Sequence, residues 1–237
     1  MSWILAAETS SSLGSLALFK NQTLYDFVDW PSDKSHSEII ADQTVELLKK
    51  NNLRIEDLDK LATSIGPGSF TGIRVALNFI KSLAYTLDKP VITTNSLLLL
   101  AAPALVTEKK VFCFQTAFRN LIYCSGFEAE NEKLDSTLVE IFSPIAQTPE
   151  QLGLLLPQHL SASALAIGRG ADLLFQDLRP ELSSVLKRNT TFLNDPHAKN
   201  FEFLFKSRSP LVATTAWPQV NPLYVRASEA EEKLRNN

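Results

Sequence analysis

The feature that most constrains the fold is a glycine-rich turn, residues 66–72, between a strand-like run and an amphipathic helix. Beyond the turn, apolar residues recur over 72–87 at the spacing of one helical face. Pro67 and Gly68 fit the second and third positions of a type II turn, because proline fixes φ and glycine accepts a positive φ. Ser69 and Thr71 can accept hydrogen bonds from the first N–H groups of the helix. The stretch predicts a strand, a glycine turn and a helix whose N-terminus is presented at the turn.

A turn of this kind has two interpretations. It either only reverses the chain, as in many α/β domains, or captures an anion such as phosphate at the helix N-terminus. No Gly-Lys-Ser or Gly-Lys-Thr follows it, and the three-glycine spacing of dinucleotide sites is absent. The turn by itself leaves both interpretations open.

The first half of the chain alternates strand and helix patterns around this turn. Ser35 and Glu38 form the S-x-x-E pattern of a capping box, which opens a helix to about residue 51. A leucine-rich helix later ends at Pro103. The strand-like runs are 3–9, 15–20, 23–30, 58–65 and 91–94. Strand–helix–strand steps force parallel pairing, and this order is that of a ribonuclease H-like lobe.

The second half of the chain restarts the same order. The polar stretch 106–110 marks a boundary, and Thr148 with Pro149 opens a short helix further on. The strand-like runs here are 111–115, 121–128, 138–142 and 164–167. The repeated order predicts a two-lobed α/β protein, with a first lobe at 1–107 and a smaller, eroded copy at 108–237.

Composition places the chain among ordinary soluble globular proteins, with 45% apolar and 21% charged residues. The N-terminus lacks the pattern of a signal peptide, and the apolar run 96–105 is too short to span a bilayer. We therefore expect a cytoplasmic protein with no membrane partner. The net charge of −3 and the lack of a basic run argue against tight nucleic-acid binding by this chain alone.

Cysteines and histidines do not form a recognisable metal-binding pattern. Cys113 and Cys124 make no C-x-x-C pair, and we expect two buried thiols rather than a disulfide. The three histidines, at 36, 159 and 197, are remote from one another in sequence and show no ligand spacing. His36 is expected to be a surface residue beside a helix cap. The sequence predicts no metal site.

Four stretches together resemble one protein family. They are GPGSFTGIR at 66–74, Ile4-Leu5-Ala6-Ala7-Glu8-Thr9-Ser10, His36-Ser37-Glu38 and Pro222-Leu223-Tyr224-Val225-Arg226. In this set and order they are similar to the TsaB (YeaZ) family, whose members take part in making threonylcarbamoyladenosine in tRNA. The resemblance covers nearly the whole chain and implies an actin-like (ASKHA) fold, built from two ribonuclease H-like lobes.

The resemblance also implies a function. The chain would be a pseudo-enzyme: a non-catalytic subunit that binds and activates TsaD, which transfers threonylcarbamoyl to the tRNA adenosine next to the anticodon. TsaE, an ATPase, would be the third component. ATP and metal would belong to TsaD and TsaE, and tRNA would be reached only through the complex. Alone, this chain would form a homodimer and hold no cofactor. The alternative is a free-standing ATP-dependent phosphotransferase of the same fold, with Glu8 and the 66–72 turn at the phosphates.

Departures from the family pattern bear on catalysis. Glu8 stands where the family usually shows Asp, and its extra methylene would displace a carboxylate by about 1.5 Å. We expect Glu8 to cap the turn that follows it. In the second half, Thr116, Phe118 and Leu121 stand in place of charged residues in the family's Asp-Ala-Arg and Glu-Val-Tyr runs. The sequence therefore offers no catalytic residue. A nucleotide role for Glu8, and an effect of the other three residues on TsaE contact, stay open.

A partner interface is predicted on the helix that follows the glycine turn. Val75 and Phe79 lie nearly opposite its apolar face, with the small Ser82 beside them, and Ile39 is placed similarly on the preceding helix. Apolar residues on two outer helix faces favour a four-helix contact with TsaD or with a second copy. The family's signature turn supplies the remaining site residues: Gly66, Pro67, Gly68, Ser69, Phe70, Thr71, Gly72 and Arg74.

Overall fold

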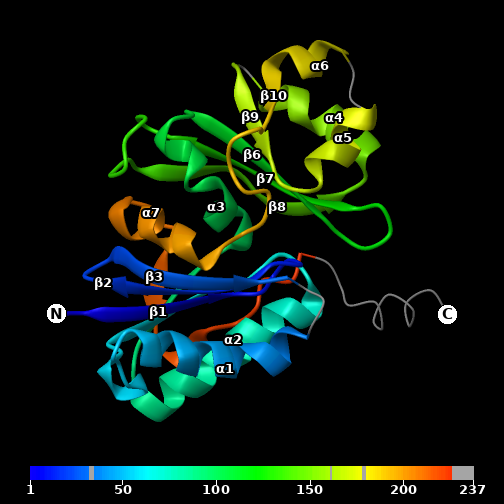
Figure 1. The fold of residues 1–237 in the computed structure, drawn as a ribbon. Helices are drawn as coiled ribbons and strands as arrows, with labels where there is room; N and C mark the ends of the chain where they lie inside the picture. Colours follow the sequence, from blue (N-terminus) through cyan, green and yellow to red (C-terminus); the bar gives the residue numbers. More distant parts are fainter. Residues whose placement is uncertain (32–34, 161, 178–179, 226–237) are drawn as a thin grey trace.

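The computed structural model describes residues 1–31, 35–160, 162–177 and 180–225, and it contains two β-sheets, one in each of two lobes. Figure 1 shows the first lobe below and the second above, with helices between the sheets and on their outer sides. In the described part of the chain, no helix has the length and apolarity needed to cross a membrane.

The first sheet has the strand order β11-β5-β4-β1-β2-β3. Its parallel core is β1, β4 and β5, and β2, β3 and β11 pair antiparallel to their neighbours. The strands are β1 (Trp3–Glu8), β2 (Gly14–Lys20), β3 (Thr23–Trp30), β4 (Lys60–Ser64), β5 (Val91–Thr94) and β11 (Ala213–Thr215). β1 is buried on both faces, which explains its continuous apolar run.

The second sheet has the order β10-β9-β6-β7-β8, in which the first-lobe order β5-β4-β1-β2-β3 is repeated strand for strand. β6, β7 and β8 are antiparallel, and β9 and β10 add in parallel. The strands are β6 (Lys110–Thr116), β7 (Ile122–Ala129), β8 (Leu138–Gln147), β9 (Ala164–Ile167) and β10 (Leu186–Arg188). The prediction of a repeated lobe is therefore confirmed.

The helices show where the second lobe has eroded. In the first lobe, α1 (His36–Lys50) and α2 (Phe70–Leu87) cover the face that points away from the second lobe (Figure 1). Shorter helices stand at the matching places of the second lobe: α4 (Pro149–Leu155), α5 (Ala171–Asp177) and α6 (Pro180–Val185). α3 (Ser96–Ala101) and α7 (Phe201–Lys206) lie between the sheets. The 3₁₀ helices are η1 (Ile55–Asp57), η2 (Ala104–Val106), η3 (Leu156–Gln158), η4 (Ala198–Asn200) and η5 (Trp217–Gln219).

A shared hydrophobic core joins the two lobes. It contains the inward side chains of both sheets, such as Phe19 and Phe127, together with the leucines of α3 and Phe201 of α7. Two further clusters lie outside it, one between the first sheet and α1 with α2, the other under α4 and α5. Because the central cluster draws on both lobes, their relative placement is part of the folded core.

The chain returns to the first lobe near its C-terminal end. β11 pairs with β5, and the backbone N–H of Ala198 donates to Ser15 Oγ at 3.0 Å. The predicted boundary at 107 falls between η2 and β6, and the division into 1–107 and 108–237 stays a prediction. From Ala198 onward the chain contacts both lobes: Arg208 pairs with Thr137, just before β8, whereas β11 joins the first sheet.

Helix starts were predicted with mixed success. Thr148 caps α4 and accepts from the backbone of Gln151, as the sequence indicated. The capping box at α1 is wrong: Ser35 is the N-cap residue, but its hydroxyl bonds Ser37 Oγ at 2.7 Å and makes no side-chain cap. Glu38 is exposed. A hydroxyl with a second hydroxyl in reach has an alternative to the helix N–H groups.

Gly72 offers a test of how tightly α2 packs on the first sheet. A Cβ at this position would overlap the backbone oxygen of Thr9, so something must shift. We expect Gly72→Ala to lower the free energy of unfolding by about 1–3 kcal/mol, measured by denaturant titration. Gly153 in α4 has open space around it and serves as the control, with Gly153→Ala raising stability by about 0.5–1 kcal/mol. Equal effects of the two substitutions would contradict the packing argument.

Candidate functional site

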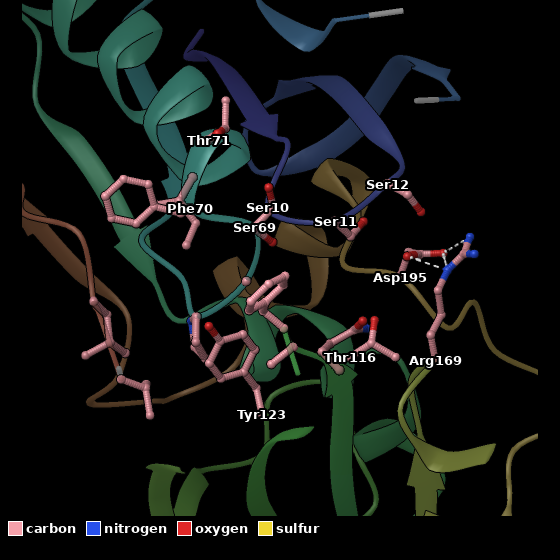
Figure 2. Close-up of a pocket in the computed structure, with 18 of the residues that line it drawn as sticks. Ser10, Ser11, Ser12, Ser69, Phe70, Thr71, Thr116, Tyr123, Arg169 and Asp195 are labelled. Atoms are coloured by element: carbon pink, nitrogen blue, oxygen red, sulfur yellow. Dashed lines mark hydrogen bonds and ion pairs between the residues drawn. The ribbon is translucent and has the colours of Figure 1, made fainter. Parts of the chain in front are cut away.

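A cleft of about 670 Å³ opens between the two lobes (Figure 2). It lies beyond the carboxyl ends of the parallel strands β1 and β4 in the first lobe and β6 and β9 in the second. Loops at this edge of parallel sheets are the usual place for ligands in α/β proteins. Its walls combine hydroxyl groups, aromatic rings and one ion pair: Ser10, Ser11, Ser12, His36, Ser69, Phe70, Thr71, Thr116, Phe118, Tyr123, Arg169, Asp195 and Tyr224.

The glycine turn forms much of the first-lobe wall, but with a different geometry from the one predicted. The positive φ of 103° belongs to Gly66, the Gly66–Pro67 bond is cis, and Gly68 has no positive φ. The type II turn is therefore wrong. The turn is shaped by the segments around it: Ser96 hydrogen-bonds the backbone oxygens of Gly66 and Pro67, and Leu223 N donates to Ile65 O at 2.7 Å.

The start of α2 is tied to the loop that follows β1. Ser69 is the N-cap residue, and its hydroxyl accepts from Gly72 N at 3.2 Å, as predicted. Thr9 Oγ1 donates to Gly72 O at 2.7 Å and accepts from Ala76 N at 3.1 Å. Ser69 N also donates to the backbone oxygen of Ser10 at 2.7 Å. The signature turn thus joins two loops of the first lobe into one wall. Thr71 is exposed in the first turn of the helix.

Arg74 takes part in an aromatic stack at the mouth of the cleft. The rings of Phe70 and Tyr224 are stacked with centroids 4.9 Å apart, and the Arg74 guanidinium lies 4.0 Å above the Phe70 ring. Arg74 Nε also donates to Tyr224 Oη at 2.9 Å. Sequence reasoning named Phe70 and Arg74 but missed Tyr224 as a site residue. The only signal for it was its place in the resembling stretch 222–226.

Glu8 lies beneath the cleft, fully buried. Its Oε1 accepts from Ser10 N at 2.6 Å, which confirms the predicted cap of the turn, whereas Oε2 has no partner. Burial raises the pKa of this carboxyl above its ordinary value of 4.5, because the charged form loses its hydration. The carboxyl is thus enclosed by the protein and engaged with the turn through one oxygen.

His36 is a correction to the sequence analysis. It lines the cleft and is half-buried, where a surface residue was expected. Trp30 Nε1 donates to Nδ1 at 3.0 Å, so the proton of the ring lies on Nε2, which bonds Ser11 O at 3.1 Å. Both nitrogens are thus engaged in a neutral imidazole. Among the described residues, no three His, Cys, Asp or Glu side chains are grouped to hold a metal ion.

The second-lobe wall carries the residues that depart from the family pattern. Thr116, the last residue of β6, and Phe118, in the loop between β6 and β7, line the cleft. Leu121 closes that loop with its backbone oxygen, which accepts from Ala117 N at 2.8 Å. The pair Arg169–Asp195 forms the far side of this wall (Figure 2).

The cysteines are placed as expected. Cys113 and Cys124 are free, fully buried thiols on neighbouring strands. Cys113 Sγ donates to Leu97 O at 3.1 Å. Burial raises the pKa of both thiols well above their ordinary range, so neither is a nucleophile at neutral pH.

The predicted interface residues lie on one helical layer but differ in exposure. Ile39, Val75 and Phe79 are partly buried and pack against the core cluster under α1 and α2, so Phe79 is less exposed than predicted. Ser82 is exposed. The same layer carries two strongly exposed apolar side chains, Val45 at 63% and Tyr85 at 69%.

Two repeated lobes around a cleft define a two-lobed actin-like α/β protein with a degenerate second lobe. A family model described as TsaD, tRNA N6-adenosine threonylcarbamoyltransferase, matches residues 31–193. The solved YeaZ structure from Pseudomonas aeruginosa superposes with a TM-score of 0.75 at 22% identity, covering 94% of this chain and 100% of that one.

Two curated relatives match along almost their full length. The chain is 26% identical over 230 residues to TsaB of Bacillus subtilis, covering 97% of this chain and 96% of that protein. It is 27% identical over 242 residues to TsaB of Haemophilus influenzae, covering 98% and 96%. Both carry the name tRNA threonylcarbamoyladenosine biosynthesis protein. The chain belongs to the TsaD family of tRNA N6-adenosine threonylcarbamoyltransferases and, within it, to the TsaB (YeaZ) proteins.

Glu8 supplies a prediction with a defined pH dependence. Its folded-state pKa is raised, so the unfolded chain releases this proton at lower pH than the folded chain does. Wild-type stability is therefore reduced as pH rises from the ordinary value of 4.5 toward the folded pKa. Glu8→Gln keeps an acceptor for Ser10 N without the charge. We expect the melting temperature of the variant to exceed that of the wild type at pH 8, with a smaller difference at pH 5. If the melting temperature of Glu8→Gln lay below that of the wild type by the same amount at both pH values, the raised pKa of Glu8 would be contradicted.

Proposed function

We propose that this chain is a non-catalytic partner subunit that binds and activates TsaD, which then transfers threonylcarbamoyl to the tRNA adenosine next to the anticodon. The names of its relatives, tRNA threonylcarbamoyladenosine biosynthesis proteins, support the pathway. The observation that carries the partner role is the outward layer of α1 and α2. Its apolar side chains are partly buried or exposed, so a partner could bury the apolar surface that they still expose to solvent.

The geometry of this layer suits helix packing. α1 and α2 lie side by side on one face of the first sheet (Figure 1). Ile39, Val75 and Phe79 are each partly open to solvent, so a partner's side chains would complete their burial. The small Ser82 beside them permits close approach of a second helix. Two helices from the partner would then form a four-helix arrangement with α1 and α2. A homodimer through the same surface would compete with TsaD.

The chemistry of the cleft supports a role without catalysis. An acyl transfer needs a base, a metal ion or a positioned acid. Of the carboxyls nearest the cleft, Glu8 caps its own turn with Oε1 and faces the interior. Asp195 is paired with Arg169. We therefore assign ATP and metal to TsaD and to TsaE, the third component.

The charge of the chain supports indirect contact with tRNA. Neutralising phosphates requires several Lys and Arg side chains on one surface. This chain has a net charge of −3 and no basic run. We assign most of the tRNA contact to the partner, in a complex that acts in the cytoplasm.

Ser82→Glu tests the interface with little risk to the fold. Ser82 is exposed, so the substitution should change the free energy of unfolding by less than about 0.5 kcal/mol. In a helix–helix contact it places an unpaired carboxylate in an apolar seam, and desolvation of that charge is costly. We expect at least about tenfold weaker binding to TsaD, measured by titration calorimetry with the purified partner.

The choice of Ser82 and a control variant separate a loss of the interface from a loss of folding and from a general effect of added charge. Phe79→Glu would disturb the core as well as the surface, because Phe79 packs against the cluster under α2. Ser163→Glu, at an exposed position of the second lobe, introduces the same charge away from the layer and should bind TsaD as the wild type does. Unchanged TsaD affinity of a folded Ser82→Glu variant would place the interface elsewhere.

A further inference from the structure

Asp195 stands on the wall of the inter-lobe cleft and is paired with Arg169. Arg169 Nε lies 2.9 Å from Oδ1 and 2.7 Å from Oδ2, and the Arg169 Nη2 atom lies 2.7 Å from Oδ2 (Figure 2). The side chain of Asp195 is only 8% exposed, whereas that of Arg169 is 55% exposed. The guanidinium thus reaches toward the open cleft while its carboxylate partner is fixed in the wall.

The guanidinium fork of arginine matches carboxylate and phosphate groups alike. An arginine at a ligand cleft, beyond the carboxyl ends of parallel strands, is therefore placed to hold an anionic ligand. Here the guanidinium of Arg169 is already paired with a carboxylate of the protein itself, Asp195. The hydrogen bonds that Arg169 donates to Asp195 raise the pKa of the guanidinium above its ordinary range, so its charge is present but already paired.

Asp195 is held in place on both sides along the chain. Just before it, Asn194 Oδ1 accepts from Gly168 N at 3.0 Å, and Asn194 O accepts from Gln115 Nε2 at 2.7 Å. Just after it, Ala198 N donates to Ser15 Oγ of the first lobe at 3.0 Å. These contacts fix the backbone on either side of Asp195, so the segment that carries the carboxylate is tied to both lobes.

The rest of the described lining offers no second cation to an anion. Arg74 is committed to Phe70 and Tyr224 at the mouth. His36 is neutral, because its Nδ1 accepts from Trp30 and its Nε2 proton is directed to Ser11 O. The other described lining side chains carry hydroxyls, an amide, aromatic rings or only aliphatic groups, apart from Gly68. We propose that Asp195 is a specificity-determining residue: it occupies the position at Arg169 that a ligand's phosphate would take, and so excludes phosphate-bearing ligands from the cleft.

The proposal is tested with inorganic pyrophosphate on the full chain by titration calorimetry. Asp195→Asn removes the charge and keeps one acceptor for Arg169. We expect no pyrophosphate binding by the wild type, and a gain in affinity of roughly tenfold to a hundredfold over the wild-type limit in Asp195→Asn. The double variant Arg169→Gln/Asp195→Asn should lose the gain, because the anion then has no fork to bind.

A matched control lies elsewhere in the second lobe. Asp172 pairs with Arg188 at 2.9 Å outside the cleft, so Asp172→Asn also frees an arginine but should not create a pyrophosphate site. A folded Asp195→Asn variant that gains nothing overturns the proposal. A second arm does not depend on the folding of that variant: pyrophosphate binding by the wild type that disappears in Arg169→Gln also overturns the proposal. Neither result bears on TsaD binding, so the proposed function is tested separately.

Discussion

The packing of the first turn of α2 against the loop after β1 is the contact on which both functional surfaces depend. Thr9 Oγ1 bridges Gly72 O and Ala76 N, and the lack of a side chain at Gly72 lets the two backbones meet. One end of α2 is thereby built into the cleft wall. The rest of the helix lies beside α1, with its outer residues facing solvent. A substitution that displaces the first turn of α2 from this loop would alter both the cleft wall and the proposed partner surface.

The second lobe repeats the first sheet but uses it differently. Its strand order is the same, while the helices at the places of α1 and α2 are shorter. The common core between the sheets binds the lobes to each other. Near the C-terminal end the chain crosses back, carrying Asp195 into the cleft wall and Tyr224 onto the mouth. The first lobe thus presents the outward layer of α1 and α2, and the second lobe supplies the opposite wall of the cleft.

The repeated lobe, the cap by Ser69, the buried cysteines and the turn at Glu8 could be predicted because each depends on residues close in sequence. The failures depend on distant partners. The shape of the glycine turn is set by Ser96 and Leu223, and His36 is drawn inward by Trp30 and Ser11. No local pattern connects Arg169 with Asp195, which are 26 positions apart, or Arg74 with Tyr224, which are 150 apart. Propensity and periodicity do not report on such contacts.

The central claim is that this chain contributes to tRNA modification by binding TsaD and not by its own chemistry. The most direct measurement is reconstitution of threonylcarbamoyl transfer to tRNA from purified components, with this chain and TsaD omitted in turn. The account predicts modified adenosine only when both are present. Product formed at an undiminished rate without this chain, or by this chain in the absence of TsaD, would contradict it.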